Sequence, residues 1–203
     1  YGAIVVGPKG SQYRDPVTGA DVSEKNTWRA DVIVDTSLSE NAGKRNYRDV
    51  ALFFQDEDNI IGTAFMPYVQ NVAGLTSVNY RAEPYKFREE QGCSLGKIFQ
   101  PCAVDKPEDP ITPLIEAHAG DAIRIHVIGA NSEQNGMFGV EGHEWPIEPY
   151  MPGADMISVV EYAGSEILDV FIRGGAGGPY RQVGDFVWSN ARLPYTQSGQ
   201  WGY

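Results

Sequence analysis

Histidine and cysteine are scarce in this chain. Its 203 residues include three His and two Cys, few for a protein that holds a transition metal through imidazole and thiolate ligands. No run of about 18 apolar residues occurs, so the sequence provides no membrane-spanning helix. Lys and Arg number 16 against 27 Asp and Glu, and the net charge of −11 argues against nucleic acid or an anionic membrane surface as the main partner.

Other features favour a globular protein rich in turns. Hydrophobic residues make up 42% and charged residues 21% of the chain, which is a folded rather than a disordered composition. The 23 Gly, 13 Pro and 11 Tyr suit an all-β protein better than a helical one. Cys93 and Cys102 match no zinc-binding spacing. They could form a disulfide in an oxidising compartment or remain two free thiols.

Short apolar segments separated by turn residues predict an antiparallel β-sandwich or barrel. The clearest alternation runs over 122–128, with Ile123, Ile125 and Val127 on one face and Arg124 and His126 on the other. One short helix is possible near 63–73, and residues 7–26 and 37–45 are expected to be loop and linker. The remaining predicted strands are 4–6, 28–34, 50–54, 77–82, 111–116, 137–140, 156–160, 166–173 and 185–188.

Several stretches of the sequence resemble a known family. Residues 116–127, Glu-Ala-His-Ala-Gly-Asp-Ala-Ile-Arg-Ile-His-Val, resemble the central strand of a cupredoxin domain. Residues 138–145, Phe-Gly-Val-Glu-Gly-His-Glu-Trp, are similar to the copper-loop segment of multicopper oxidases. Gly-Asp-Phe-Val-Trp at 184–188 and Gly-Gln-Trp-Gly at 199–202 resemble the frame of the closing motif of that family. Residues 50–58 and 66–80 are similar to the ceruloplasmin-like branch, and the chain also resembles large bacterial multicopper oxidases, some of them linked to manganese oxidation.

The resemblance implies a fold and a domain division. It implies an antiparallel Greek-key β-sandwich of cupredoxin type over residues 46–203, preceded in 1–45 by the last strand of another cupredoxin domain and a linker. Tyr1-Gly2-Ala3 fits the same frame as Trp201-Gly202-Tyr203. We therefore expect the chain to be a segment or processed product of a longer protein that spans about one repeat period of a multidomain array. The predicted core residues are Leu52, Phe53, Ile123, Ile125, Val127, Phe138, Trp145, Val170, Ile172, Phe186 and Trp188.

The same resemblance implies that the copper ligands are lost. The three ligand positions of the copper-loop motif fall on Gly136, Gly139 and Glu141, and His143 falls on a following His that is not a ligand. In the closing motif, Ser189-Asn190-Ala191 replaces His-Cys-His, Tyr195 replaces the next His, and Gln200 takes the axial position. A blue-copper site needs a thiolate and two imidazoles. No catalytic, cofactor-binding or metal-ligating residue is therefore predicted in this chain, and copper is expected only in the parent assembly.

The three histidines are each interpreted as structural. His143 is predicted to be a structural residue in a buried turn beside Trp145, although it could serve as a ligand. His126 is expected on the polar face of its strand, facing solvent or hydrogen-bonded. His118 is expected to be exposed and could reach a neighbouring domain.

Several carboxylates and one run of glycines could belong to functional sites. Residues 56–58, Asp-Glu-Asp, could bind calcium or manganese, but a solvated acidic turn is favoured. Residues 174–178, Gly-Gly-Ala-Gly-Gly, lack the lysine of a phosphate loop and are expected to form a tight turn. Four glutamates near the open end of the sandwich could include an acid–base pair: Glu133, Glu141, Glu144 and Glu148.

The sequence thus predicts a copper-free segment or subunit of a secreted multicopper oxidase, extracellular or periplasmic. In the whole enzyme, substrate oxidation would be coupled to the reduction of oxygen to water. Its expected partners are neighbouring cupredoxin domains or other copies of the chain, with divalent cations attracted to the acidic surface. A non-enzymatic extracellular module for assembly or adhesion is the alternative, and a subunit that binds divalent metal through carboxylates alone is a third.

Overall fold

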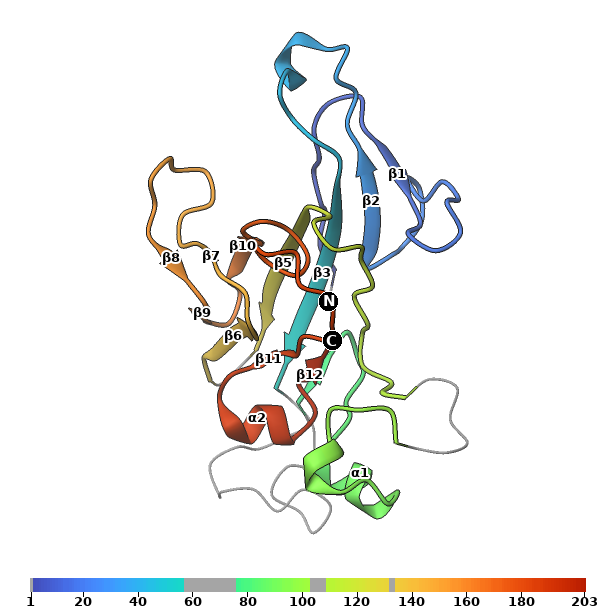
Figure 1. The fold of residues 1–203 in the computed structure, drawn as a ribbon, viewed down its shortest axis with the longest axis vertical. Coiled ribbons are helices and arrows are strands. Elements are labelled where there is room, and N and C mark those ends of the chain that lie inside the picture. Colours follow the sequence, from blue (N-terminus) through green and yellow to red (C-terminus); the bar gives the residue numbers. More distant parts are fainter. Residues whose placement is uncertain (1, 57–75, 103–108, 132–133) are drawn as a thin grey trace.

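The chain folds into two packed β-sheets, shown in Figure 1. A computed structural model describes residues 2–56, 76–102, 109–131 and 134–203. The first sheet has the order β1-β2-β3-β5-β10, with β4 also paired to β3. Its strands are β1 (Gln12–Arg14), β2 (Arg29–Ile33), β3 (Tyr47–Gln55), β4 (Ser77–Val78), β5 (Ile123–Ala130) and β10 (Ile167–Phe171).

The second sheet is smaller and has the order β12-β11-β6-β9. It consists of β6 (Gly136–Val140), β9 (Val159–Tyr162), β11 (Trp188–Asn190) and β12 (Trp201–Gly202). A hairpin of β7 (Trp145–Pro146) and β8 (Met156–Ile157) stands beside it. The prediction of an all-β sandwich is confirmed. Within it, β3 and β5 run parallel over eight residue pairs, whereas the other strand pairs of the described residues are antiparallel.

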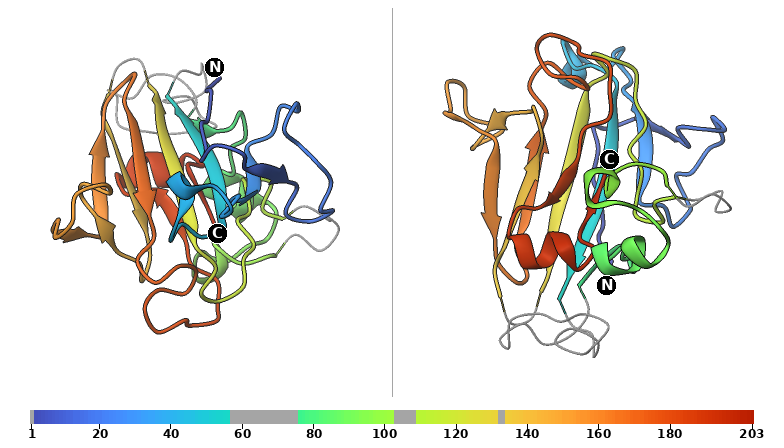
Figure 2. Two further views of the ribbon diagram at one scale, coloured as in Figure 1. Left: turned by 90° about the horizontal axis from the view of Figure 1, so that it is seen from above. Right: turned by 60° about the horizontal axis from the view of Figure 1, so that its bottom comes forward.

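Helices are few and short in the described residues, and they are α1 (Tyr85–Glu90), α2 (Leu193–Gln197) and the 3₁₀ turns Ser39–Asn41 and Leu95–Lys97. Figures 1 and 2 show α1 and α2 at the same end of the sandwich. Pro84 comes directly before α1, and Pro194 lies in the first turn of α2, where the missing N–H is not needed. No helix in the described ranges is long and apolar enough to cross a membrane.

The core lies between the sheets and is centred on Phe54 of β3. Its ring packs against three aromatic rings of the second sheet, with centroid distances of 5.9 Å to Phe138, 5.1 Å to Tyr162 and 6.2 Å to Trp188. The prediction of Phe53 as a core residue is wrong, because side chains alternate along β3 and the inward position falls on Phe54. Phe186 is only half-buried because it precedes β11 and packs edge-on against His143. The other predicted core residues are buried.

Four predicted segments differ from the structure. Residues 4–6 form no strand, and Ile4 is 94% exposed. Residues 111–116 are irregular, since proline at 110 and 113 removes two ladder donors. The strand predicted at 185–188 begins only at Trp188, and the strand predicted at 77–82 ends at Val78.

Two further predictions concern loops. Residues 7–26 contain β1, a strand that a loop-like composition concealed. The helix predicted near 63–73 lies outside the described residues.

β1 and β2 pair into the first sheet, so residues 12–33 extend the sandwich in this chain. The assignment of residues 1–45 to the end of a preceding domain stays a prediction.

Candidate functional site

Several of the positions that the sequence analysis equates with copper ligands lie near the end of β11. Asn190, at the position of the family cysteine, is buried, and its Nδ2 donates to Gln200 Oε1 at 2.7 Å and to the Tyr162 hydroxyl at 3.1 Å. Its Oδ1 accepts the backbone N–H of Met137 at 3.0 Å. The amide of Asn190 is thus hydrogen-bonded to groups from three different segments.

Gln200, at the axial position, completes this network. It is also buried, and its Nε2 donates to the carbonyl of Gln55 at 2.7 Å. The backbone N–H of Gln200 donates to the carbonyl of Tyr195 at 3.0 Å. Tyr195, which replaces a ligand histidine, is buried under the Arg192 guanidinium, 5.1 Å from the ring centroid. These residues therefore hold the end of β11, α2 and β3 together.

Gly136, the first ligand position of the copper-loop motif, opens β6 beside the same network. A Cβ atom at Gly136 would lie 2.1 Å from Cζ of Tyr162, so the tyrosine ring fills the space that a side chain at 136 would need. Tyr162 is fully buried, and burial raises the pKa of its hydroxyl well above the ordinary value of 10.0, which keeps it protonated. Tyr162, Asn190 and Gln200 form what we call the amide network.

This amide network does not fit copper. Asn190 and Gln200 offer neutral amide groups that already bond to one another, whereas a blue-copper centre needs a thiolate and two imidazoles. Both cysteines of the chain are joined in a disulfide elsewhere. In the residues that the structure describes, no three His, Cys, Asp or Glu side chains come together as a metal-binding group.

A second cluster surrounds His126 on the opposite face of the first sheet. His126 lies between two carboxylates, with Nδ1 2.6 Å from Asp169 and Nε2 2.8 Å from Asp49. Despite this short distance, Nε2 forms no hydrogen bond with Asp49. Arg124 holds Asp49 through two hydrogen bonds of 2.9 and 2.6 Å. The expectation of a polar face is correct, but Arg124 and His126 are buried on it, with the Arg124 guanidinium against the rings of Tyr47 and Phe171.

The charges of this cluster determine the protonation of Asp49. Burial alone would raise the pKa of its carboxyl, but the close contact with His126 and the two hydrogen bonds and positive charge of Arg124 outweigh burial and lower the pKa below 3.8. Burial raises the pKa of Tyr47, which lies under Arg124, to about 12. Asp49 is therefore ionised at neutral pH beside a permanent cation.

This ionisation makes folding stability depend on pH in the acid range. Because folding lowers the pKa of Asp49, its stabilising effect is complete above the unfolded value of 3.8 and is lost as pH falls through the lower native value. We expect the difference in free energy of unfolding between wild type and Asp49→Asn to be constant above about pH 5 and to shrink below about pH 4. Urea titrations at each pH measure it, with Asp155→Asn, an exposed site, as control. A difference that stays constant down to about pH 2.5 would contradict the assignment.

His143 is a structural residue in this fold, as the sequence predicts. It is buried after the turn that follows β6. Its Nδ1 lies 2.8 Å from the carbonyl of Glu141, and its Nε2 accepts the backbone N–H of Gly177 at 3.1 Å. These bonds fix the neutral tautomer with the proton on Nδ1. His143 thereby anchors the glycine-rich turn at 174–178.

The remaining predicted groups are dispersed. His118 is exposed and lies 3.4 Å from Asp121. Asp56 is buried and accepts the backbone N–H of Gln134 at 3.3 Å, so for this residue the solvated acidic turn is wrong. Residues 57–58 and Glu133 lie outside the described residues. Glu144 pairs with Arg173, and Glu141 and Glu148 are exposed.

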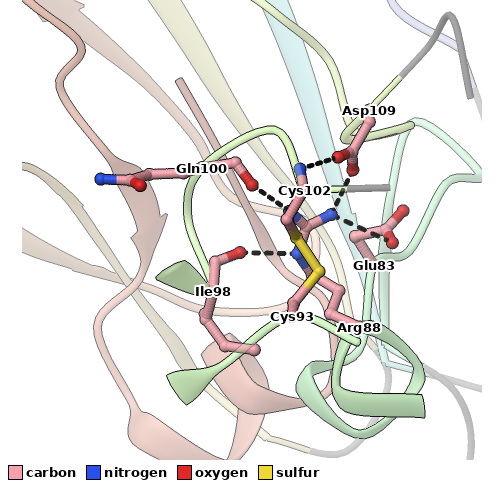
Figure 3. Close-up of a disulfide and its surroundings, with 7 residues drawn as sticks. All are labelled: Glu83, Arg88, Cys93, Ile98, Gln100, Cys102 and Asp109. Atoms are coloured by element: carbon pink, nitrogen blue, oxygen red, sulfur yellow. Dashed lines mark hydrogen bonds and ion pairs between the residues drawn. A yellow bond between two sulfur atoms is a disulfide. The ribbon is translucent and has the colours of Figure 1, made fainter. Parts of the chain in front are cut away.

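A third cluster, which the sequence analysis missed, lies around the disulfide. Cys93 and Cys102 are bonded to each other, which resolves the alternatives left open above. Figure 3 shows the fully buried Arg88 beside the disulfide, between the carboxylates of Glu83 and Asp109. Its Nε and Nη2 donate to the carbonyls of Ile98 and Gln100, each at 2.6 Å. In the sequence, only the spacing of nine positions between the two cysteines pointed to this cluster. The burial of Arg88 could not be predicted, because α1 is too short to show a periodic burial pattern.

Comparison with known proteins gives structural neighbours only. No family model matches the sequence, and no curated protein matches it. The chain is similar to a blue copper oxidase from Nitrosomonas europaea, with 14% identity over 88% of this chain and 54% of that one and a TM-score of 0.47. It is also similar to a copper-containing nitrite reductase from Thermus scotoductus SA-01, with 13% identity over 76% of this chain and 29% of that one and a TM-score of 0.46.

A third solved structure, titled a multicopper oxidase, has 9% identity over 90% of this chain and 57% of that one, with a TM-score of 0.47. The chain thus spans between 29% and 57% of the length of these three proteins. Its structural neighbours are multicopper oxidases and a nitrite reductase at low identity. At TM-scores of 0.46 and 0.47, these similarities assign neither a branch nor an activity to the chain.

Proposed function

We propose that this chain is a copper-free cupredoxin segment of a secreted multicopper oxidase, with a structural and interface role. Residues 1–45 supply the end of a preceding domain and a linker, and residues 46–203 form a domain without copper ligands. Neighbouring cupredoxin domains hold the copper of the assembly, and this segment forms interfaces with them or with other copies of the chain. Substrate oxidation and the reduction of oxygen to water take place there and not in this segment.

One observation carries the proposal. The resemblance to the copper motifs equates Gly136, Asn190 and Gln200 with ligand positions. In the structure Gly136 and Asn190 contact Tyr162, and Gln200 is hydrogen-bonded to Asn190. Their convergence supports a cupredoxin frame in which each ligand has been replaced.

The chemistry of the replacements supports a structural role. Each polar group of the amide network has a partner inside the protein, so none is left to bind a metal or a substrate. A buried polar group contributes stability only when it is hydrogen-bonded, and a fully bonded network specifies one packing arrangement. The segment can therefore act as a rigid spacer and an interface between copper-bearing domains.

Separate observations support the proposed compartment of the protein and the proposed role of its surface charge. The Cys93–Cys102 disulfide favours an oxidising compartment, either extracellular or periplasmic. The net charge of −11 attracts divalent cations toward the assembly by long-range steering. A cation attracted in this way needs no dedicated site in this chain.

Copper analysis of the purified chain tests the proposal. After incubation with Cu(II) and gel filtration, we expect no stoichiometric copper by mass spectrometry and no intense blue absorption. The physical reason is that the only two sulfur atoms of cysteine are joined in the disulfide. One copper per chain with a copper–thiolate absorption band would refute the assignment of a ligand-free domain.

A further inference from the structure

A cleft opens on the outer face of the first sheet, beside the start of β3. It has a volume of about 490 Å³, within the range of small-molecule sites. Segments distant in the sequence form it: residues 6–8, residues 44–47, the strands β5 and β10, and the turn between β7 and β8. It is separate from the amide network, because none of the three side chains of that network lines it.

Aromatic rings form part of the wall of this cleft. They belong to Tyr47 of β3, Phe171 of β10 and Tyr150 of the hairpin turn, and Tyr150 packs edge-on against Phe171 with a centroid distance of 5.6 Å. Tyr150 is accessible from solution, because it is 72% exposed. A planar ring that enters the cleft therefore meets aromatic surface that it can reach, and aromatic pairs attract at centroid distances of about 4.5–7 Å.

Three cationic side chains line the same cleft, and no carboxylate of the described residues does. Arg124 is neutralised by Asp49, which it holds through two hydrogen bonds. Lys44 and Arg45 are exposed, and neither forms an ion pair within the described ranges. The ammonium group of Lys44 donates to the neutral amide oxygen of Asn41 at 3.1 Å. The charges of Lys44 and Arg45 are thus available to an anion from solution.

The acidic excess of the protein lies elsewhere in the sequence. Residues 1–48 contain seven Lys and Arg against six Asp and Glu, whereas residues 49–203 contain nine against 21. Asp169 contacts the Tyr150 hydroxyl and His126, but it does not line the cleft. Because exposed charges more than about 8 Å apart are largely screened at physiological salt, an anion in the cleft responds mainly to Lys44 and Arg45.

We propose that this cleft binds a small organic anion with a planar ring, an aromatic carboxylate. The ring packs against Tyr150 and Phe171, and the carboxylate accepts charge-assisted hydrogen bonds from Lys44 or Arg45. An inorganic anion would use the cations without the rings, and a neutral aromatic compound would use the rings without the cations. The inference does not rest on the proposed function, because it involves no copper and no residue equated with a ligand position.

The test compares three probes, benzoate, benzamide and acetate. Benzamide keeps the ring and lacks the charge, whereas acetate keeps the charge and lacks the ring. Binding to the whole chain is followed by ¹H–¹⁵N NMR of the backbone amides of Arg45 and Phe171, at a constant ionic strength of about 50 mM. We expect benzoate to bind with a dissociation constant of about 5 mM, and the other two probes to bind about fivefold more weakly.

Two variants each remove one half of the proposed site, Arg45→Gln and Tyr150→Ala. Arg45→Gln is expected to weaken benzoate binding about fivefold and to leave benzamide within about twofold, because only benzoate carries a charge. Tyr150→Ala should bring the affinity for benzoate down toward that for acetate, since the accessible ring is lost. Lys97→Gln removes an exposed cation that does not line the cleft, so it is the matched control and should leave all affinities within about twofold.

Three results would overturn the proposal. The first is the absence of saturable shifts with benzoate up to about 40 mM. The second is binding of acetate or benzamide as tight as that of benzoate, and the third is an effect of Arg45→Gln no larger than that of Lys97→Gln. The copper measurement described above bears only on the proposed function, so failure of either proposal leaves the other standing.

Discussion

Replacing Arg88 by methionine is expected to lower the free energy of unfolding by about 3–5 kcal/mol. Arg88 is fully buried, and it is paired with Glu83 and Asp109. The variant removes the guanidinium between two buried carboxylates, and it also removes the donors to the carbonyls of Ile98 and Gln100. Urea denaturation of both proteins with the disulfide intact measures the effect.

A matched control separates burial from charge pairing. Arg173→Met removes an arginine that also pairs with a glutamate, but the Arg173 side chain is 53% exposed. Exposed pairs contribute about 0–1 kcal/mol, so this variant should remain close to wild type. If Arg88→Met were no more destabilising than Arg173→Met, the guanidinium would not be the centre of the disulfide region.

The second large effect is expected in the amide network. Asn190→Leu keeps the side-chain volume but leaves Gln200 Oε1, the Tyr162 hydroxyl and the Met137 N–H without their partner. Because each unsatisfied buried group costs about 1–3 kcal/mol, we expect a loss of about 3 kcal/mol after partial relaxation. Thermal and urea unfolding measure it.

Ser189 provides the control within the same strand. It precedes Asn190, its side chain points to the other face of the sheet, and it is half-buried. Ser189→Ala should change stability by less than about 0.5 kcal/mol. Equal effects of the two substitutions would mean that the network does not hold β11 and α2 together.

The alternation of β5 was sufficient to predict that strand, because each apolar side chain of 123–127 points to the core with a period of two. The same alternation could not show that Arg124 and His126 are buried. That burial comes from side chains of the neighbouring strands β3 and β10, which contribute Asp49 and Asp169 beside His126 and the rings of Tyr47 and Phe171 beside Arg124. Local periodicity reports which face a residue occupies, but not what covers that face.

The candidate sites also contain some features that the sequence predicted and others that it could not. The resemblance to the copper motifs equated Gly136, Asn190 and Gln200 with ligand positions, and in the structure Gly136 lies against Tyr162 and Asn190 bonds to Gln200. The role of Tyr162 had no signal, since its hydroxyl contacts Asn190 across 28 positions of sequence. The Arg88 cluster was missed for the same reason: Glu83, Asp109 and the disulfide come together through a loop that has no regular periodicity.

The central claim is that the chain keeps a copper-site frame whose ligands have been replaced. Cu(II) binding to a variant with restored ligands tests it most directly. The variant combines Gly136→His, Asn190→Cys, Tyr195→His and Gln200→Met with Tyr162→Ala, which frees the space beside position 136. In a preparation with native circular dichroism, we predict one copper per chain with the intense blue copper–thiolate absorption. The same variant with Tyr162 retained should lack that absorption. A folded variant with a titratable new thiol and no such absorption would contradict the claim.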